Sequence, residues 1–298
     1  MTQTPLVQIQ CQRDDPIIWC KLDYLNPSGS TKDRIAAYIL DKARVEGRLA
    51  TNDVVVEASS GSTSIALALA CAQRGLRFIA VMPASVSNER VLMIRALGGE
   101  VRFTPAAMGI RGAISESEHI ACEVNAFLPR QFSNPDNPRA HEVGTAREIL
   151  EQLPGGRVQV IVAGVGTGGT LVGLYRGLRA SNPNLEAVLA RPVKVTEDLE
   201  QECCSFGSQI PGVVDGVSKI FSPDLFKNLI TVDVRQEQAI EAARDLIRRG
   251  FPVGPSAGLN YLAALHAARE SKPDLPVVTV FPDRMERYFS TMLFDTYR

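Results

Sequence analysis

The chain has 298 residues, is 45% hydrophobic, and carries 32 basic and 33 acidic residues for a net charge of −1. This length can bury one large core or two smaller ones, and the balanced charge argues against nucleic-acid binding and polybasic membrane binding. No apolar run approaches the roughly 20 residues of a membrane helix, and the first ten residues lack the pattern of a signal peptide. We therefore expect a cytoplasmic protein that acts on small molecules, with neither nucleic acid nor a membrane as partner.

Apolar, β-branched segments alternate with helical patterns along the chain. The predicted strands are residues 17–22, 54–57, 78–82, 101–103, 158–163, 185–189, 229–232 and 277–281. The predicted helices are residues 33–46, 63–74, 87–97, 111–125, 170–181, 236–249 and 257–271. This alternation predicts an α/β protein of two domains, each a mainly parallel twisted sheet flanked by helices.

The domain boundary is predicted at the turn-rich stretch SNPDNP, residues 133–138. The domains are then 1–138 and 139–298, and the first ~30 residues are free to pack on the second domain. Residues 190–208 show no clear period and predict a surface loop.

The cysteines indicate reduced thiols and no metal. They lie without a CxxC pair or the Cys/His spacing of a zinc site, at Cys11, Cys20, Cys71, Cys122, Cys203 and Cys204. The last two are adjacent, a poor geometry for an ordinary disulfide, so we interpret them as loop thiols.

The first segment with chemical character is NPSGSTKDR, in which Ser30 or Thr31 is expected to cap a helix that has Lys32 in its first turn. The positive end of a helix lowers the pKa of a lysine, and a neutral amine is what Schiff-base chemistry needs. Taken alone, the segment fits a solvated lysine beside Asp33 at least as well.

The second segment, EASSGSTS, runs from a buried-type strand into a Ser/Gly turn and a helix. Five of the six positions from Ser59 to Ser64 carry hydroxyls, more than one helix cap requires. With the backbone N–H groups at the helix start, they predict a cradle for a carboxylate or phosphate.

The third segment, GVGTGGT at residues 164–170, also joins a strand to a helix and predicts a phosphate site. Its glycines also satisfy the GxGxxG dinucleotide pattern, and Arg191 follows at about the position where a residue that accepts NADP is expected. An NADP oxidoreductase is therefore an alternative.

The fourth segment, GPSAGLN, places Ser256 at a helix start, where an ordinary N-cap is the simplest interpretation.

In this order the four segments resemble those of the fold-type II pyridoxal phosphate (PLP) enzymes, most closely the cysteine synthase and cystathionine β-synthase branch. The similarity spans nearly the whole chain and includes QFSNPDNPRAH, VMPASVSNERVLMIRALGGEV and RYFST. It implies that Lys32 forms the Schiff base with PLP and that Ser256 bonds the pyridine nitrogen. It also implies a phosphate cradle of Gly166, Thr167, Gly168, Gly169 and Thr170. The substrate, through its carboxylate above all, is expected at Ser59, Ser60, Gly61, Thr63, Gln131 and Gly212.

The resemblance implies β-replacement at an activated serine. A hydroxyl opposite the pyridine nitrogen holds its proton less well than a carboxylate does, so the ring is a weaker electron sink and loss of the β-substituent is favoured. Lys32, once displaced by the substrate amine, is expected to take the α-proton. The resulting α-aminoacrylate accepts sulfide or a thiol to give cysteine or a thioether, and water to give pyruvate and ammonia.

Two departures from the family pattern bear on the substrate. Ser62 stands where most relatives carry an Asn that contacts the ring oxygen of the cofactor, so its shorter side chain is expected to need a water bridge. The segment IPGVVDGVS lacks the arginine of enzymes that use O-phosphoserine, which favours O-acetylserine.

Several alternatives stay open at this stage. A cysteine or serine β-lyase, a cystathionine-forming enzyme and a catalytically silent relative share the same motifs. A homodimer is the habit of the family. A docked serine acetyltransferase is compatible with the sequence but has no support in it.

Overall fold

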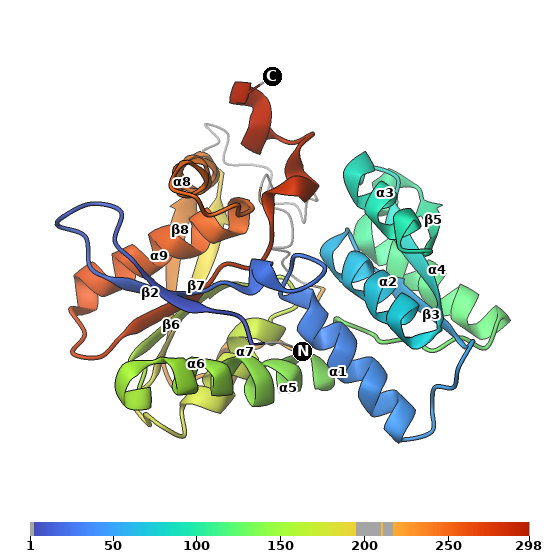
Figure 1. Ribbon diagram of the computed structural model, residues 1–298, viewed down its shortest axis with the longest axis horizontal. Helices are drawn as coiled ribbons and strands as arrows, with labels where there is room; N and C mark the ends of the chain where they lie inside the picture. Colours follow the sequence, from blue (N-terminus) through green and yellow to red (C-terminus); the bar gives the residue numbers. More distant parts are fainter. Residues whose placement is uncertain (1–2, 195–209, 211–216, 298) are drawn as a thin grey trace.

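The computed structural model describes residues 3–194, 210 and 217–297. Its strands form a six-stranded and a three-stranded sheet, and the two are seen side by side in Figure 1. The larger sheet has the strand order β1-β2-β9-β6-β7-β8 and the smaller one the order β3-β4-β5. The strands are β1 Leu6–Ile9, β2 Ile18–Lys21, β3 Val54–Ala58, β4 Arg77–Pro83, β5 Glu100–Thr104, β6 Val160–Gly164, β7 Glu186–Val193, β8 Leu229–Arg235 and β9 Val277–Val280.

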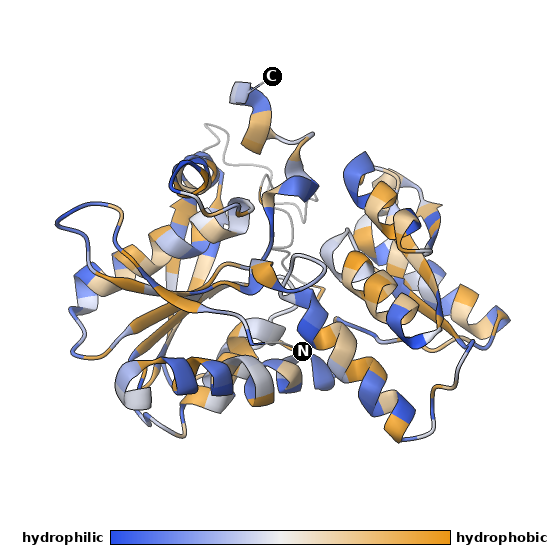
Figure 2. Cartoon of the chain, viewed as in Figure 1, coloured by the Kyte–Doolittle hydropathy of each residue, from blue (hydrophilic) through white to orange (hydrophobic). Residues whose placement is uncertain are grey.

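All pairings are parallel except that of β1 with β2. The central strands β6 and β9 are almost wholly apolar and buried, as expected for parallel strands covered on both faces. Figure 2 shows the strands of both sheets as mainly hydrophobic. The predicted α/β fold class is therefore confirmed.

Helices cover both faces of each sheet. On the smaller sheet, α1 Lys32–Val45, α2 Ser62–Arg74 and α3 Asn88–Ala96 share a core on one face, while α4 Gly109–Glu123 packs on the other. On the larger sheet, α8 Gln236–Arg248 and α9 Pro255–Ser271 cover one face, and α6 Ala146–Gln152 and α7 Gly169–Leu178 cover the other. No helix in the described residues is long and apolar enough to cross a membrane.

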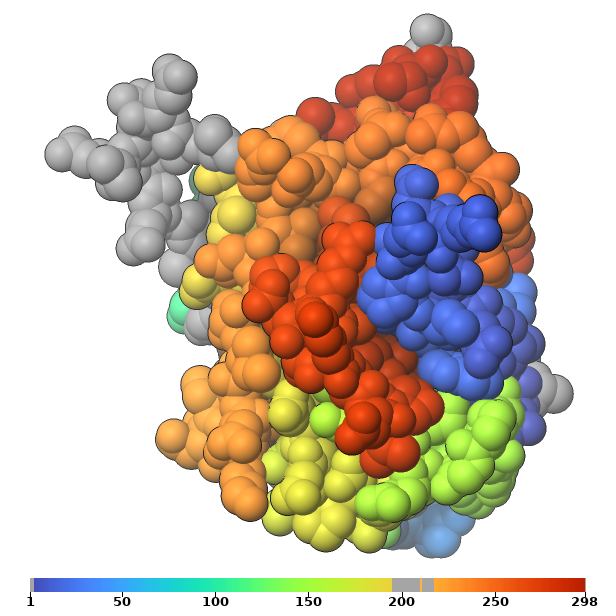
Figure 3. Space-filling model, turned by 90° about the vertical axis from the view of Figure 1, so that its left-hand side faces the viewer, coloured from blue at the N-terminus to red at the C-terminus, as the bar shows by residue number. Residues whose placement is uncertain are grey.

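The N-terminal hairpin of β1 and β2 belongs to the larger sheet. Ile18 of β2 pairs with Val277 of β9, and Figure 3 shows this segment in blue against the C-terminal strand and helices in red and orange. The chain then passes through α1 to the smaller sheet, so the N-terminal end of α1 lies between the two sheets (Figure 1).

Every predicted strand and helix is present, with ends that differ by at most four residues. Two regions were not predicted: β1, and the helical stretch formed by α5 Asp136–Ala140, the π-helical turn His141–Thr145 and α6. The surface loop predicted at residues 190–208 is wrong for residues 190–193, which belong to β7, and its residues 195–208 lie outside the described residues. Pro138 lies in the first turn of α5, where a backbone N–H has no partner within the helix, so the proline does not prevent the helix.

A buried cluster of charged side chains fixes the start of α1. The Arg34 guanidinium lies 2.8 Å from Asp23 and 2.7 Å from Glu148, and the Lys21 ammonium lies 2.8 Å from the second oxygen of Glu148. Burial alone would raise the pKa of Asp23, but the adjacent Arg34 charge lowers it. Because Arg34 follows Lys32 by two residues, the cluster ties the position of Lys32 to β2 and α6.

Candidate active site

One open pocket is lined by residues from the segments selected from the sequence. It measures about 990 Å³ when the solvent at its mouth is included. Its walls come from the start of α1, the turns after β3 and β6, the start of α9 and the segment after β9. Ligand sites of open parallel sheets lie outside the carboxyl ends of the strands, and the pocket occupies that position in both sheets.

Lys32 lines this pocket as the first residue of α1 and is partly accessible from it. The Ser30 hydroxyl accepts the backbone N–H of Lys32 at 3.3 Å, whereas Thr31 donates its hydroxyl to Asp23. The pKa of Lys32 is lowered as predicted, but burial is its main cause, and the charges of Asp283 and Asp23 oppose the change.

The turn from Ser59 to Thr63 can be built only around a glycine. Gly61 has φ +154° and ψ −72°, and a Cβ there would lie 2.4 Å from Cδ of Arg90. The Gly61 N–H donates to the Ser59 hydroxyl at 3.0 Å. The turn leads into the 13-residue helix α2, whose first N–H groups and dipole favour an anion.

Gln131 closes the side of this turn. The Thr63 hydroxyl donates to its side-chain oxygen at 2.6 Å, and its side-chain nitrogen donates to the carbonyl of Ala58 at 2.6 Å. Its backbone N–H donates to Glu57 at 3.1 Å. The Gln131 side chain is therefore held in place before any ligand binds.

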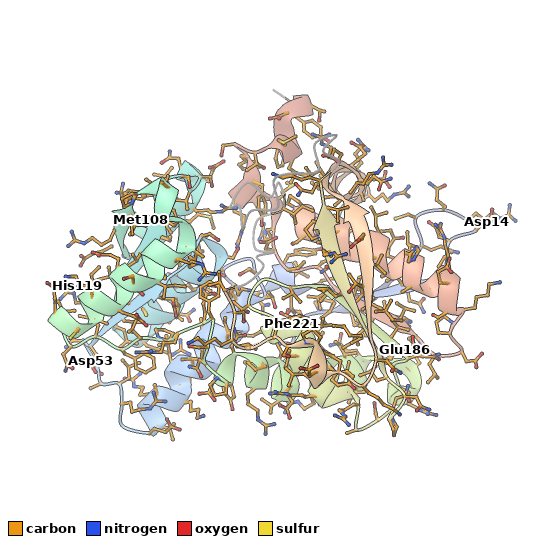
Figure 4. The ribbon with its side chains drawn as sticks, turned by 180° about the vertical axis from the view of Figure 1, so that it is seen from behind. Asp14, Asp53, Met108, His119, Glu186 and Phe221 are labelled. Atoms are coloured by element: carbon orange, nitrogen blue, oxygen red, sulfur yellow. The ribbon has the colours of Figure 1, made fainter. Side chains whose placement is uncertain are left out.

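The turn after β6 forms the opposite wall. Gly168 has φ +81°, and a Cβ there would lie 2.5 Å from Cβ of Phe221, which is labelled at the centre of Figure 4. Thr167, Gly168 and Thr170 line the pocket at the start of α7. With its glycines, hydroxyls and helix N-terminus, this wall fits a phosphate group.

The start of α9 forms a third wall. Ser256 lines the pocket, and its hydroxyl has no hydrogen-bond partner within the described part of the chain. One turn later, Asn260 accepts the N–H of Gly164 at 2.8 Å and donates to the carbonyl of Val280 at 2.8 Å. Asn260 thereby fixes the phosphate turn relative to β9.

Ser62 is engaged by charged residues that the sequence analysis did not select. Its hydroxyl donates to Asp283 at 3.2 Å and accepts from Arg287 at 2.9 Å. Asp283 also accepts from the Tyr288 hydroxyl at 2.6 Å, and Arg287 donates to the carbonyl of Ser28 at 2.7 Å. The expected contact of Ser62 with the cofactor ring stays a prediction, and it would have to compete with Asp283 for the single hydroxyl hydrogen.

The structure brings together most of the residues selected from the sequence. Those that line the pocket are Lys32, Ser59, Ser60, Ser62, Thr63, Gln131, Gly166, Thr167, Gly168, Thr170 and Ser256. Gly61 and Gly169 do not line it and instead allow close packing behind it, and Gly212 lies outside the described residues. Glu57, Asp283 and Arg287 were not selected from the sequence, although Arg287 is the first residue of the RYFST motif and Asp283 lies four residues before it.

The pocket fits PLP better than the alternatives. It joins a lysine of lowered pKa, an anion-binding turn on each side and a hydroxyl at a helix start. In contrast, Arg191 forms a two-bond ion pair with Asp233 at 2.6 and 2.8 Å on the exposed surface of β7 and β8. No group of three or more metal-ligating side chains occurs among the described residues.

Comparison with known proteins agrees with this geometry. The family model described as "Pyridoxal-phosphate dependent enzyme" matches residues 1–283. The chain is 36% identical to a cysteine synthase of Staphylococcus aureus over 98% of this chain and 94% of that protein. The crystal structure of an O-ureido-L-serine synthase is 35% identical, with a TM-score of 0.87 over 99% of this chain and 93% of that one. An O-acetylserine-dependent cystathionine β-synthase from Helicobacter pylori is 32% identical, with a TM-score of 0.82 over 98% of this chain and 96% of that one. The chain therefore belongs to the pyridoxal-phosphate-dependent enzymes, and within them to those of the cysteine synthase type.

Proposed function

We propose that this enzyme replaces the β-substituent of O-acetylserine with sulfide, forming L-cysteine and acetate. The observation that carries the proposal is the position of Lys32 in one pocket with two anion-binding turns. The relatives support the same substrate, because one is a cysteine synthase and another depends on O-acetylserine.

The two turns have separate proposed ligands. The phosphate of PLP binds the turn from Gly166 to Thr170, and the substrate carboxylate binds the turn from Ser59 to Thr63 together with Gln131. Ser256 bonds the pyridine nitrogen, which fits its position in the pocket with a hydroxyl that no other described residue engages. PLP, when bound, withdraws electrons from the substrate α-carbon and so acidifies the α-proton.

Lys32 has two roles in this proposal. It holds the cofactor covalently, and after the substrate amine displaces it, its neutral amine takes the α-proton. Burial favours the neutral amine, since it lowers the lysine pKa. The carboxylate turn, in which hydrogen bonds hold the Gln131 side chain, positions the α-carbon relative to Lys32 for proton removal.

The experiment is a paired assay of the purified holoenzyme. Cysteine and acetate are quantified after incubation with O-acetylserine and sulfide, and the Lys32→Ala variant serves as the control. We expect one acetate for each cysteine from the wild type and a loss of at least ~10³-fold in the variant. A wild type that carries PLP but makes no cysteine would contradict the proposal.

A cysteine β-lyase is the second candidate, because a hydrogen sulfide-producing enzyme from Fusobacterium nucleatum shares the fold. The same assay run with cysteine alone separates the two functions. Sulfide release from cysteine that is faster than cysteine formation from O-acetylserine would favour the lyase.

We further propose a cytoplasmic homodimer. The four cysteines within the described residues are free thiols, which suits a reducing compartment. The C-terminal residues Phe289, Met292 and Tyr297 are large and exposed, a surface that a second copy can cover. Light scattering of the purified protein tests the dimer.

The domain boundary at residue 138 also stays a proposal, which limited proteolysis tests.

A further inference from the structure

The side chain of Asn137 connects the two anion-binding walls of the pocket. Asn137 lies in α5 and is 1% exposed. Its side-chain nitrogen donates to the backbone carbonyl of Gln131 at 2.8 Å and to the hydroxyl of Thr167 at 3.1 Å. One amide group thus contacts the carboxylate side and the phosphate side at once.

The chemistry of the partners fixes the orientation of this amide. A backbone carbonyl can only accept, so the nitrogen must face Gln131, and its two hydrogens are both used. The amide oxygen faces the start of α7, where a Cβ on Gly169 would lie 1.8 Å from it. Any side chain at position 169 would clash with the Asn137 amide, so a glycine is needed there. This explains why the phosphate motif has a glycine at a position that does not line the pocket.

The same contacts determine the direction in which Thr167 donates. Its hydroxyl oxygen accepts from Asn137 and, at 3.4 Å, from the N–H of Gly169. A hydroxyl has two acceptor positions and one hydrogen, so with both positions taken the hydrogen is left to donate. Because Thr167 lines the pocket, that donor is available to an anion there.

We propose that Asn137 is a positioning residue that makes the Thr167 hydroxyl a donor to the cofactor phosphate and at the same time holds Gln131 at the substrate carboxylate. This rests on the function proposed above, since it assigns a phosphate to the side of Thr167. Asn137 does not line the pocket and acts through these two neighbours.

A second bridge provides an internal comparison. The Ser218 hydroxyl donates to the backbone carbonyl of Thr167 at 2.5 Å and lies 3.4 Å from that of Phe132. It restrains the same turn without contacting the Thr167 hydroxyl. Ser218→Ala therefore loosens the turn but leaves the direction of the Thr167 donor unchanged.

The test is the Asn137→Asp variant of the holoenzyme. A carboxylate can only accept, so the Thr167 hydroxyl turns toward it and away from the phosphate, and the Gln131 carbonyl loses its donor. We expect the dissociation constant of PLP, measured by equilibrium dialysis, to rise roughly 10- to 100-fold, and the KM for O-acetylserine to rise with it.

The control is Asn134→Asp, the same change three residues earlier in the chain. The Asn134 side chain donates to the carbonyl of Pro129 and accepts from the N–H of Asp136, and it bonds to neither Gln131 nor Thr167. We expect Asn134→Asp to keep both constants within about threefold of the wild type. Ser218→Ala loosens the turn without redirecting the Thr167 donor, so we expect it to raise the PLP dissociation constant less than Asn137→Asp does.

A double variant shows whether Asn137 acts through Thr167. In a Thr167→Val background, Asn137→Asp should raise the PLP dissociation constant by less than about threefold more, because the donor is already gone. Wild-type PLP affinity in Asn137→Asp, or fully additive effects, would overturn the inference. If Asn137→Asp does not fold, Asn137→Ser enters the same cycle, since its side chain is too short to bridge. A wild type that retains no PLP would instead refute the proposed function.

Discussion

Glu57 makes the stability of the fold depend on pH near neutrality. Glu57 is 3% exposed near the end of β3, and its carboxylate accepts the backbone N–H groups of Ala58 at 3.0 Å and Gln131 at 3.1 Å. Burial raises its pKa from 4.5 to about 7, although these hydrogen bonds oppose the change. Between about pH 4.5 and pH 7, Glu57 is therefore protonated in the folded protein and ionised in the unfolded chain.

The sign and size of the effect follow from this difference. Between about pH 4.5 and pH 7 the folded state binds more protons than the unfolded state, so the free energy of unfolding falls as pH rises. Over this interval, at about 1.4 kcal/mol for each pH unit, the loss amounts to about 3 kcal/mol, and it is complete above about pH 7. The Glu57→Gln variant has no carboxyl group to titrate at this position, so its free energy of unfolding does not show this fall with pH.

The assay compares urea unfolding of the wild type and Glu57→Gln from pH 5 to pH 8.5. Other ionisable groups contribute equally to both proteins, so the difference between the two free energies isolates Glu57. We expect the wild type to lose about 2 to 3 kcal/mol relative to the variant across this range. A constant difference, or one of the opposite sign, would refute the reasoning.

Two further changes test the packing around the site. Arg34→Met leaves the buried Asp23 charge unpaired and should lower the free energy of unfolding by about 3 to 5 kcal/mol. In the same urea titration, Arg74→Met at a partly exposed ion pair should cost about 1 kcal/mol or less. Gly168→Ala should weaken PLP binding at least tenfold, because Cβ would meet Phe221, whereas Gly155→Ala, at a similar φ in open space, should leave PLP affinity unchanged in equilibrium dialysis.

Much of the fold could be predicted because its signals are local. Buried parallel strands such as β6 are continuous apolar runs, and amphipathic helices such as α8 repeat along their own length. The strand β1 is short and only partly buried, so its pairing with β2 leaves little pattern. The helix α5 was missed because its sequence, DNPRA, consists mainly of residues that favour turns.

The site was predictable motif by motif but not as a network. The hydroxyl-rich turn that begins at Ser59 and the glycine turn around Gly168 indicate anion sites by their composition, whereas Lys32 and Ser256 were selected only through the family resemblance. Glu57 and Asn137 act through contacts with residues 74 and 30 positions away, and no local pattern reveals such pairs. The pKa of Lys32 shows the same limit, since its main cause is burial by distant segments.

The central claim is that Lys32 holds the cofactor. Borohydride reduction of the holoenzyme, followed by digestion and mass spectrometry, locates the lysine that carries it. We expect the pyridoxyl-phosphate adduct on the peptide that contains Lys32, and on no other lysine. An adduct on Lys21, Lys42 or Lys219, or none at all in a protein that retains PLP, would contradict the account.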